Sequence, residues 1–272
     1  MSPAPMPADL ASARALVTGA TGGIGAAIVR ALHARGAHVG ITGRRREVLE
    51  ELASELGDRV EPLPADLSDA AELRSLVDRA GRVDVLVANA ALPGSGRLDS
   101  YSPEEIDRAI DVNLRAPMQL ARALSPAMAE RGSGHVVLIS SLAGKVASSH
   151  ATVYNATKFG VRGFGFALHD ELRGTGVGVT TVFPGFIEGA GMFAEADVDL
   201  PSGVGTRRPE QVADAVIEGI DKGRAEIDVA PLGLRLGGWL FGASPTLVSL
   251  ITRKLGGAQV GEALGEGQRD KR

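Results

Sequence analysis

Two residues near the middle of the chain stand at a spacing that suits proton transfer. Tyr154 is one of only two tyrosines, and Lys158 follows four residues later. Residues at i and i+4 lie on one face of a helix, so the phenol and the ammonium project together. A free phenol titrates at about pH 10, and a cation about 4 Å away contributes roughly 4 kcal/mol at a dielectric of about 20. The spacing therefore predicts that the lysine lowers the pKa of the tyrosine, which then serves as a general acid or base.

A glycine-rich loop early in the chain predicts a dinucleotide site. The apolar run at 14–18 leads into TGATGGIG, where Gly19, Gly23 and Gly25 have the spacing G-x-x-x-G-x-G. One glycine makes the tight turn, one lets the backbone approach a pyrophosphate, and one lets helix and strand pack closely. The helix start then offers free N–H groups to the phosphates. A glycine-rich turn without a ligand is the alternative.

The second apolar run ends in TGRRR, where dinucleotide folds read the ribose 2′ position. An acidic residue there selects NAD, whereas an arginine accommodates the 2′-phosphate of NADP. Arg44 is the first candidate for that phosphate and Arg45 the second, because guanidinium groups suit phosphate oxygens. Asp66 ends the third apolar run and can accept from an adenine amino group, with a helix-capping Asp as the alternative. The predicted cofactor is NADP(H), with NAD(H) possible.

The elements that must position these residues alternate regularly along the chain. Strand-like runs and amphipathic stretches follow one another without an internal repeat or a linker. This rhythm predicts an α/β fold, a doubly wound parallel sheet of about seven strands with helices on both faces. The predicted strands are 14–19, 37–43, 59–67, 83–91, 134–141, 177–185 and 225–231, and the predicted helices are 22–36, 45–57, 68–81, 102–132, 151–176 and 208–223. We expect one domain over 1–272 with its core at 14–231.

Composition excludes several other chemistries. The 272 residues include no cysteine, which rules out disulfides, thiolate catalysis and Cys-zinc sites. The five histidines lack ligand spacing, so no metal site is predicted. A net charge of −4 argues against nucleic acid or an anionic membrane as a general partner, though not against a local basic patch. The Pro/Ala-rich start does not resemble a signal peptide, so we expect a cytoplasmic protein with loose tails at 1–12 and 265–272.

Taken together, these motifs resemble the short-chain dehydrogenases/reductases, in their compact single-domain branch. The matching pieces are TGATGGIG, ADL, NAA, DVNL, LISSLAG, YNATK and FPGFI, spread over about 14–231. The resemblance implies an NAD(P)-dependent oxidoreductase that moves a hydride between NADPH and a carbonyl or secondary alcohol carbon. A 3-oxoacyl-thioester reductase and, in another class, a non-catalytic NADP-binding regulator are the alternatives.

The resemblance also implies roles for individual residues. Tyr154 is the acid/base, Ser141 orients the substrate oxygen, and Lys158 holds the nicotinamide ribose and tunes the tyrosine. Asn113 anchors a water that links Lys158 to solvent. The family further implies a four-helix interface and hence a homodimer or homotetramer. The implied cofactor contacts are Gly19, Thr21, Gly23, Ile24, Gly25, Arg44, Arg45, Asp66, Asn89, Tyr154, Lys158, Pro184, Gly185 and Ile187.

The sequence after residue 231 forms an apolar extension, at 232–260. Residues 236–252 carry no charge, but the run is too short for a membrane span and is interrupted by glycines and Pro245. The only tryptophan, Trp239, lies here. The extension packs on the fold or an oligomer partner, covers an apolar substrate pocket, or touches a membrane surface with Arg253 and Lys254 at the interface. The second interpretation predicts an apolar carbonyl or alcohol substrate.

Overall fold

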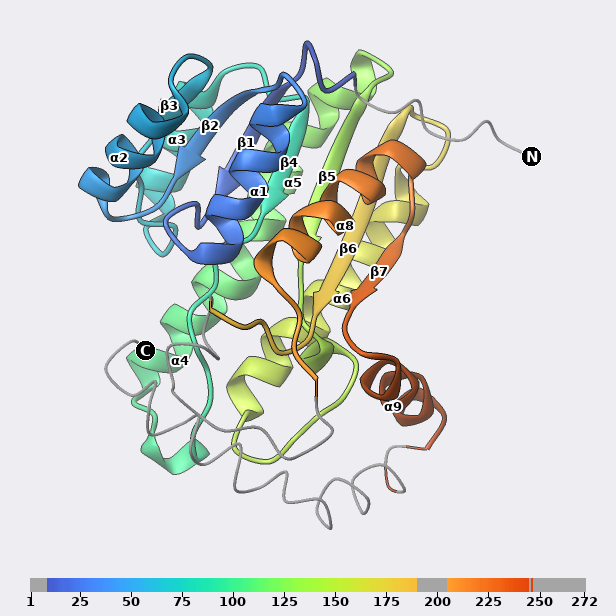
Figure 1. Ribbon diagram of the computed structural model, residues 1–272. Helices are drawn as coiled ribbons and strands as arrows, with labels where there is room; N and C mark the ends of the chain where they lie inside the picture. The colour runs from blue at the N-terminus through green and yellow to red at the C-terminus, as the bar shows by residue number, and fades with distance from the viewer. Residues whose placement is uncertain (1–8, 190–204, 245, 247–272) are drawn as a thin grey trace.

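The computed structural model describes residues 9–189, 205–244 and 246, and its centre is one parallel sheet (Figure 1). The strand order is β3-β2-β1-β4-β5-β6-β7, and every neighbouring pair is parallel. The predicted doubly wound sheet of about seven strands is confirmed. The strands are β1 (Arg14–Thr18), β2 (His38–Thr42), β3 (Val60–Pro62), β4 (Val85–Ala88), β5 (Gly134–Ile139), β6 (Val177–Pro184) and β7 (Glu226–Val229).

Helices cover both faces of the sheet (Figure 1). Helices α1, α2 and α8 pack on one face, and α3, α5 and α6 pack on the other. The longer helices are α1 (Gly23–Ala34), α2 (Arg46–Leu56), α3 (Ala70–Ala80), α4 (Pro103–Ile110), α5 (Ala116–Glu130), α6 (Thr152–Glu171), α8 (Pro209–Lys222) and α9 (Leu232–Ala243). Three short turns of helix are η1 (Leu98–Ser100), η2 (Asp111–Arg115) and η3 (Leu142–Gly144).

The central strands are largely apolar because both of their faces are buried, whereas the edge strands β3 and β7 carry carboxylates and are partly exposed. Leu16 and Val17 are neighbours on β1, and both are fully buried. Leu16 packs in the cluster with α3, α5 and α6, whereas Val17 packs in the cluster with α1, α2 and α8. Burying a side chain of this size stabilises a fold by roughly 1.5–3 kcal/mol. The two cores therefore fix the sheet between its helical layers and fix where its strands end.

The third strand is shorter than predicted. We expected a strand over 59–67, but β3 ends at Pro62. Leu63 still donates its N–H to the carbonyl of Ile41 in β2 at 2.8 Å, and Ala65 donates to the carbonyl of Gly43, directly after β2, at 3.1 Å. Pro62 and Pro64 lack N–H groups and alternate with these donors, so only one side of this edge segment can bond regularly. The regular ladder therefore stops early although the chain continues in the same direction.

The predicted helix over 102–132 is divided into three pieces. Ser102 and Glu105 form the expected capping box at the start of α4. The π-helical segment η2 then separates α4 from α5, and the Ala116 N–H bonds to the Asp111 carbonyl five residues back. Pro117 has no N–H to offer to the carbonyl four residues earlier, which interrupts the α-helical pattern at this point. The widened turn contains Asn113.

The predicted loose N-terminal tail is too long. Leu10 is buried at 3% exposure in the core that includes α1 and α2. Ala11 lies against Gly36, whose φ of 94° marks the turn after α1. An apolar side chain in the core ties down residues 9–12, so the prediction of a loose tail is wrong for them. The predictions for 1–8, 190–204 and most of 245–272 lie outside the described residues.

The apolar extension begins with a helix that the sequence analysis did not predict. Helix α9 starts directly after β7, below the sheet in Figure 1. Within the ranges described, no helix has the length and apolarity that crossing a bilayer requires.

Candidate active site

The predicted site residues gather where the strands end. The order of the strands reverses between β1 and β4, and the chain leaves these two strands toward helices on opposite faces of the sheet, α1 and α5. In open parallel sheets, ligands bind at such a point, beyond the carboxyl ends of the strands. Gly19 follows β1, Asn89 follows β4, and Ser141 follows β5. The topology thus brings the glycine loop and the reacting residues to the same edge.

The glycine loop requires glycine because of its close approach to the loop after β4. Gly19 has a φ of 66°, and a Cβ there would lie 2.8 Å from the Cα of Ala90. Asn89 closes this contact, since its Nδ2 donates to the carbonyls of Thr18 and Gly19 at 3.0 and 3.2 Å. The Thr18 hydroxyl accepts from the backbone N–H groups of Asn89 and Ala90, both at 2.9 Å. Asn89 therefore shapes the loop, a role that its position in the sequence did not disclose.

The start of α1 is suited to an anion. Its N-cap, Gly22, has no side chain to bond the first N–H groups, and the first turn contains no acidic residue. Gly22 and Gly23 are exposed, whereas Gly25 is buried against the backbone of Gly19. Uncapped N–H groups and the helix dipole together favour a phosphate. This cradle of backbone N–H groups and small residues fits the pyrophosphate of a dinucleotide.

The two arginines predicted to read the 2′ position lie beside this cradle. The Nη2 of Arg45 donates to the Thr21 carbonyl in the glycine loop at 3.0 Å. Arg44 is exposed, and its positive charge helps to lower the pKa of Asp66. A guanidinium group bonded to the glycine loop, with a second one on the neighbouring residue, fits a dinucleotide that carries an additional phosphate.

Asp66 has a different local role from the helix cap that was its alternative. Its Oδ1 accepts from the backbone N–H and the hydroxyl of Ser68, at 2.9 and 2.6 Å. The cap of α3 is Asp69 instead. Burial works to raise the pKa of Asp66, but the bonds from Ser68 and the charges of Arg108 and Arg44 lower it overall. The carboxylate is therefore ionised and able to accept at neutral pH.

Ser141 and the loop after it are held in place from several sides. The Ser141 hydroxyl donates to the carbonyl of Pro184, at 3.4 Å, and accepts from the N–H of Ala143, at 3.1 Å. Ser140 donates to the carbonyl of Lys158 at 3.0 Å, which ties the end of β5 to α6. These contacts place the predicted substrate-orienting hydroxyl next to the helix that carries Tyr154.

Asn155 is a positioning residue that the sequence analysis missed. It is buried, and its Nδ2 donates to the carbonyls of Ala143 and Val146 at 2.7 and 3.1 Å. Its Oδ1 accepts from the N–H of Ser148 at 3.2 Å. One amide thereby fastens the loop 143–148 to α6, one residue after Tyr154. The only signal in the sequence was an asparagine inside a helix, where it is a poor helix former.

Lys145 fastens the same loop to the edge of the sheet. Its Nζ lies 2.6 Å from Asp228 Oδ1 and 2.9 Å from Glu226 Oε2, both on β7. It also lies 3.9 Å from the centre of the Phe183 ring. Lys145 is 8% exposed, so its two carboxylates compensate a nearly buried charge. The loop between Ser141 and Ser148 is thus bonded both to α6 and to β7.

Tyr154 and Lys158 lie together on α6 as predicted, but the predicted direction of the pKa shift is wrong. Burial raises the pKa of Tyr154 to about 12, while its hydrogen bond with Ser141 acts in the opposite direction. Burial lowers the pKa of Lys158 to about 8. The Nζ of Lys158 lies 5.5 Å from the centre of the tyrosine ring and donates to the Ile139 carbonyl at 3.0 Å. Desolvation therefore dominates, and the phenol holds its proton at neutral pH.

Asn113 lies in the widened turn η2 and is almost fully buried. Its Oδ1 accepts from the N–H of Leu92 at 2.6 Å, and its Nδ2 donates to the carbonyl of the same residue at 2.9 Å. The side chain is thus engaged by the loop after β4. Pro117 cannot donate to the backbone carbonyl of Asn113, so this carbonyl is a candidate for the predicted water contact.

The remaining predicted contacts lie after β6. Pro184 ends the strand, and the N–H of Gly185 donates to the Val229 carbonyl at 3.0 Å. A Cβ on Gly185 would lie 3.1 Å from Ala230 and 3.3 Å from Leu142, so the backbone here runs close to the Ser141 loop. Ile187 is buried at 3% exposure. These residues form the β6 side of the same edge.

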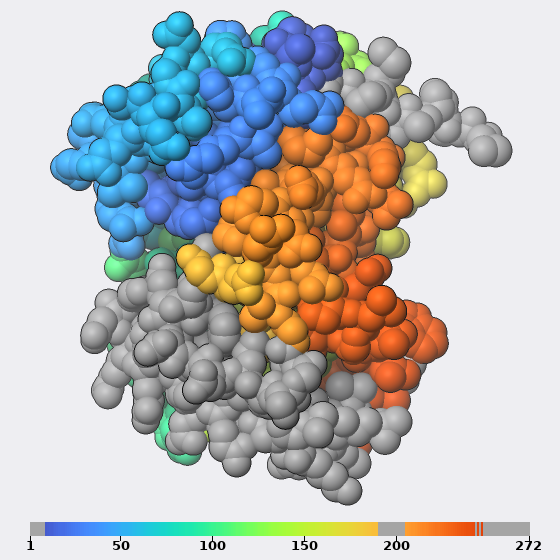
Figure 2. Space-filling model, in the orientation of Figure 1, coloured from blue at the N-terminus to red at the C-terminus, as the bar shows by residue number. Residues whose placement is uncertain are grey.

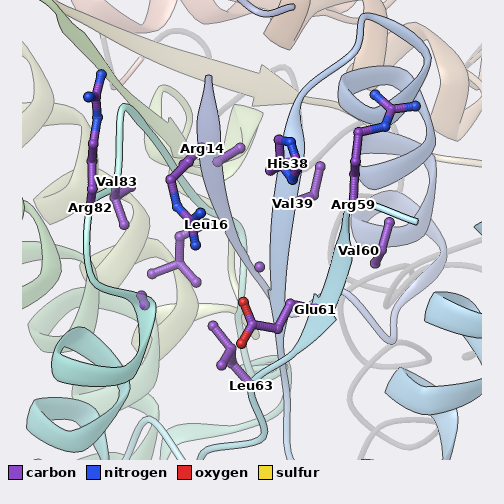
Figure 3. Close-up of a pocket in the computed structure, with 13 residues that line it drawn as sticks. Arg14, Leu16, His38, Val39, Arg59, Val60, Glu61, Leu63, Arg82 and Val83 are labelled. Atoms are coloured by element: carbon purple, nitrogen blue, oxygen red, sulfur yellow. The ribbon is translucent and has the colours of Figure 1, made fainter. Parts of the chain in front are cut away.

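A cavity of about 170 Å³ lies at the opposite end of the sheet (Figure 3). Arg14 and His38 begin β1 and β2 there, and Arg59, Leu63 and Val83 also line it. None of the predicted site residues takes part. It is therefore separate from the edge that holds Tyr154.

Comparison with known proteins agrees with this architecture. Residues 13–200 match the family model described as short chain dehydrogenase. The chain is 43% identical over 186 residues to Nodulation protein G of Rhizobium sp. (strain N33), covering 67% of this chain and 76% of that protein. It is 37% identical over 221 residues to Ketoacyl reductase HetN of Nostoc sp., and this match covers 79% of this chain and 77% of that protein. The chain belongs to the short-chain dehydrogenase/reductase family, a family of oxidoreductases.

Solved structures show the same fold. A short-chain dehydrogenase from Sphingobium yanoikuyae, in complex with NADPH, has a TM-score of 0.76 and 29% identity, covering 86% of this chain and 94% of that one. The closed form of serine dehydrogenase, complexed with NADP+, has a TM-score of 0.73 and 32% identity, covering 81% and 95%. A 3-ketoacyl-(acyl-carrier-protein) reductase from Brucella melitensis, complexed with NADH, has a TM-score of 0.73 and 27% identity. The match covers 80% of this chain and 96% of that one. These complexes agree with the predicted cofactor class, NADP(H) with NAD(H) possible.

Proposed function

We propose that this protein is an NADP(H)-preferring oxidoreductase that reduces a carbonyl group of an apolar substrate to a secondary alcohol. One observation carries the proposal. The Ser141 hydroxyl, the Tyr154 phenol and the Lys158 amine meet at one place, where the pKa of Tyr154 is about 12 and that of Lys158 about 8. Both groups therefore hold a proton at neutral pH, which suits proton donation to a carbonyl oxygen.

The residues of the chain divide the work around the substrate oxygen. NADPH, when bound, supplies the hydride that the carbonyl carbon gains. Ser141 donates a hydrogen bond to the oxygen and orients it, and Tyr154 gives its proton to that oxygen. The Lys158 cation stabilises the phenolate that remains. With a pKa of about 12, Tyr154 then takes up a proton readily, through the proposed water at the Asn113 carbonyl.

The pKa of Tyr154 decides which protonation state the free protein offers to a substrate. Oxidation of an alcohol requires a deprotonated Tyr154 as base, and this form is scarce at neutral pH when the pKa is about 12. Reduction requires the protonated form, which predominates. The free protein is therefore in the protonation state that reduction needs, which agrees with reduction as the direction we propose.

The cofactor preference rests on the glycine loop and its two arginines. The free N–H groups at the start of α1 bind the pyrophosphate, and Arg44 and Arg45 bind the 2′-phosphate. Asp66 accepts from the adenine amino group. The similar structures in complex with NADPH and NADP+ support this assignment. The similar reductase in complex with NADH keeps NAD(H) as a possible second cofactor.

A second candidate is the reduction of 3-oxoacyl thioesters. Two of the similar proteins carry names of this kind, Ketoacyl reductase HetN and the reductase from Brucella melitensis. The chemistry at Tyr154 is the same for both candidates. They differ in the substrate that lies beyond the carbonyl, so the substrate range distinguishes them.

The assembly we propose is a homodimer or homotetramer in the cytoplasm. Met118 on α5 is 40% exposed and Phe166 on α6 is 65% exposed. Large apolar side chains on the two helices that the family pairs between subunits support this assembly. Light scattering of the purified protein tests it, since a monomer would contradict it.

Consumption of NADPH and of NADH with a panel of carbonyl substrates tests the proposed function. The panel contains apolar ketones, aldehydes and 3-oxoacyl thioesters, each offered with both cofactors. We expect turnover with NADPH to exceed turnover with NADH. Activity confined to the thioesters supports the second candidate. Tight binding of NADPH without turnover on any substrate means either that the panel lacks the substrate or that the protein is a cofactor-binding regulator.

A further inference from the structure

Helix α9 has an inner face that fixes its orientation on the protein. Leu234, Gly238 and Phe241 recur at i, i+4 and i+7 and turn inward, with Gly238 buried and the other two half-buried. A Cβ on Gly238 would lie 3.6 Å from the Cβ of Lys145. The rings of Phe241 and Phe159 are 6.3 Å apart. Helix α9 is therefore packed on the Ser141–Ser148 loop and on α6.

The outer face of α9 is an exposed apolar stripe. We call Leu232, Leu236, Trp239 and Leu240 the α9 stripe, and their exposures are 72%, 55%, 73% and 43%. The spacing i, i+4, i+7 and i+8 puts all four on one side of the helix. Figure 2 shows α9 standing out from the body at the lower right. Large apolar side chains gathered on one protruding face mark an interaction surface.

The charged residues that lie near helix α9 in the sequence, after β7, are all basic. Between Val229 and Gly261 the sequence carries Arg235, Arg253 and Lys254 and no acidic residue. The chain as a whole has a net charge of −4, so its acidic residues lie elsewhere. Arg235 is exposed on α9, and the other two basic residues lie outside the described residues. The positive charge of Arg235 beside exposed leucine and tryptophan complements a surface that is both apolar and anionic.

We propose that the α9 stripe docks this protein on an anionic lipid bilayer. The leucines and Trp239 enter the boundary between headgroups and acyl chains, and Arg235 meets lipid phosphates. Helix α9 follows β7 at the same edge of the sheet as Ser141 and Tyr154. Docking therefore brings the candidate active site toward the bilayer, where apolar carbonyl compounds accumulate. The proposal does not depend on turnover, so it stands apart from the proposed function.

The single tryptophan makes the test direct, because all tryptophan fluorescence comes from Trp239. The full chain is mixed with vesicles of phosphatidylcholine containing phosphatidylglycerol, or of phosphatidylcholine alone. We expect a blue shift of the emission and co-sedimentation with the anionic vesicles, and several-fold weaker binding to the neutral ones. The double variant Leu236→Glu/Leu240→Glu keeps the fluorophore. Its affinity for anionic vesicles should fall at least about tenfold.

The control is Leu98→Glu, which changes a leucine of 56% exposure in η1, outside the α9 stripe. It should bind vesicles like the wild type, and circular dichroism shows whether each variant is folded. Emission unchanged by anionic vesicles overturns the proposal. The proposal is also overturned if the wild-type emission shifts with protein concentration alone and light scattering gives the double variant a smaller mass. Both results together would assign the α9 stripe to contact with a second copy of the chain. Equal losses in the double variant and in Leu98→Glu overturn it too.

Discussion

The two halves of the candidate site are built differently. On the cofactor side, Gly22, Gly23 and Arg44 are exposed, and the loop is shaped mainly by backbone contacts. On the reacting side, Lys158 and Asn155 are buried, and each polar group there bonds to a neighbouring element. Under the proposed function, the recognition of a cofactor therefore depends on side chains at the rim, whereas the chemistry depends on groups enclosed in the fold.

This difference predicts different consequences of mutation. A residue at the rim contributes a contact with the cofactor, so its loss changes cofactor affinity and little else. A buried residue sets the position and pKa of its neighbours, so its loss changes the chemical step. The variants below test this division, from the largest expected effect to the smallest.

Replacement of Lys158 by methionine removes the buried cation beside Tyr154. We expect kcat/KM for reduction to fall roughly 10³-fold, because the phenolate left after proton transfer loses its stabilisation. The pKa of Lys158 is about 8, so the wild type should lose activity as pH rises through that value. The variant should show no such decline. A pH profile of initial rates measures both effects.

The matched control is Lys222→Met, which removes an exposed lysine that pairs with Glu218 on α8. It should leave the profile unchanged. A Lys158→Met variant that retains the decline near pH 8 would assign that decline to another group.

Asn155→Ala removes three hydrogen bonds that fasten the Ser141 loop to α6. We expect kcat to fall about 10- to 100-fold with little change in KM, because the loop shifts while substrate access remains. Ser148→Ala is the control, since Asn155 bonds only the backbone of Ser148. Steady-state kinetics measure kcat and KM of both variants. An unchanged kcat in Asn155→Ala would show that the reaction does not need the three hydrogen bonds of Asn155.

The variant Arg44→Ala tests whether this exposed arginine binds the 2′-phosphate of the cofactor. We expect KM for NADPH to rise about tenfold, from the loss of one charge-assisted contact, while KM for NADH stays the same. Arg46, which lies 3.8 Å from Glu50 on the surface, provides the control as Arg46→Ala. Equal losses with NADPH and NADH would contradict the assignment of Arg44 to the 2′-phosphate.

The buried His135 makes the stability of the fold depend on pH in the acid range. Burial lowers its pKa to about 4, with a smaller effect from the charge of His169. The unfolded chain therefore takes up the proton first, and the stability contributed by the neutral ring is lost as pH falls from about 6.5 toward 4. The loss reaches about 1 kcal/mol by pH 5.5.

His135→Gln keeps a donor for the Thr180 hydroxyl, which lies 2.8 Å from the ring. We expect the difference in unfolding free energy between wild type and variant to become smaller as pH falls from 7 to 5.5. Urea titrations at the two pH values measure it. A difference that is independent of pH would show that His135 does not titrate in this range.

The sequence indicated candidate residues that stand at a recognisable spacing or at the end of a strand. It did not indicate residues whose role depends on contacts with distant backbone groups. Gly19, Ser141, Tyr154 and Lys158 were found because strand ends and the i, i+4 spacing bring them together. Asn155 was missed because its partners are backbone groups of the loop 143–148, which no pattern identifies. The pKa of Tyr154 was predicted in the wrong direction because a spacing reveals a nearby charge but not the burial of both groups.

The central claim is that Tyr154 donates the proton to a carbonyl reduced with NADPH. Its most direct test is the rate of NADPH consumption by wild type and by Tyr154→Phe with the same substrate, together with the NADPH affinity of each. We predict that kcat falls roughly 10³-fold in the variant while NADPH binds with nearly the same affinity. Wild-type turnover in Tyr154→Phe would contradict the account and require another proton donor at this edge of the sheet.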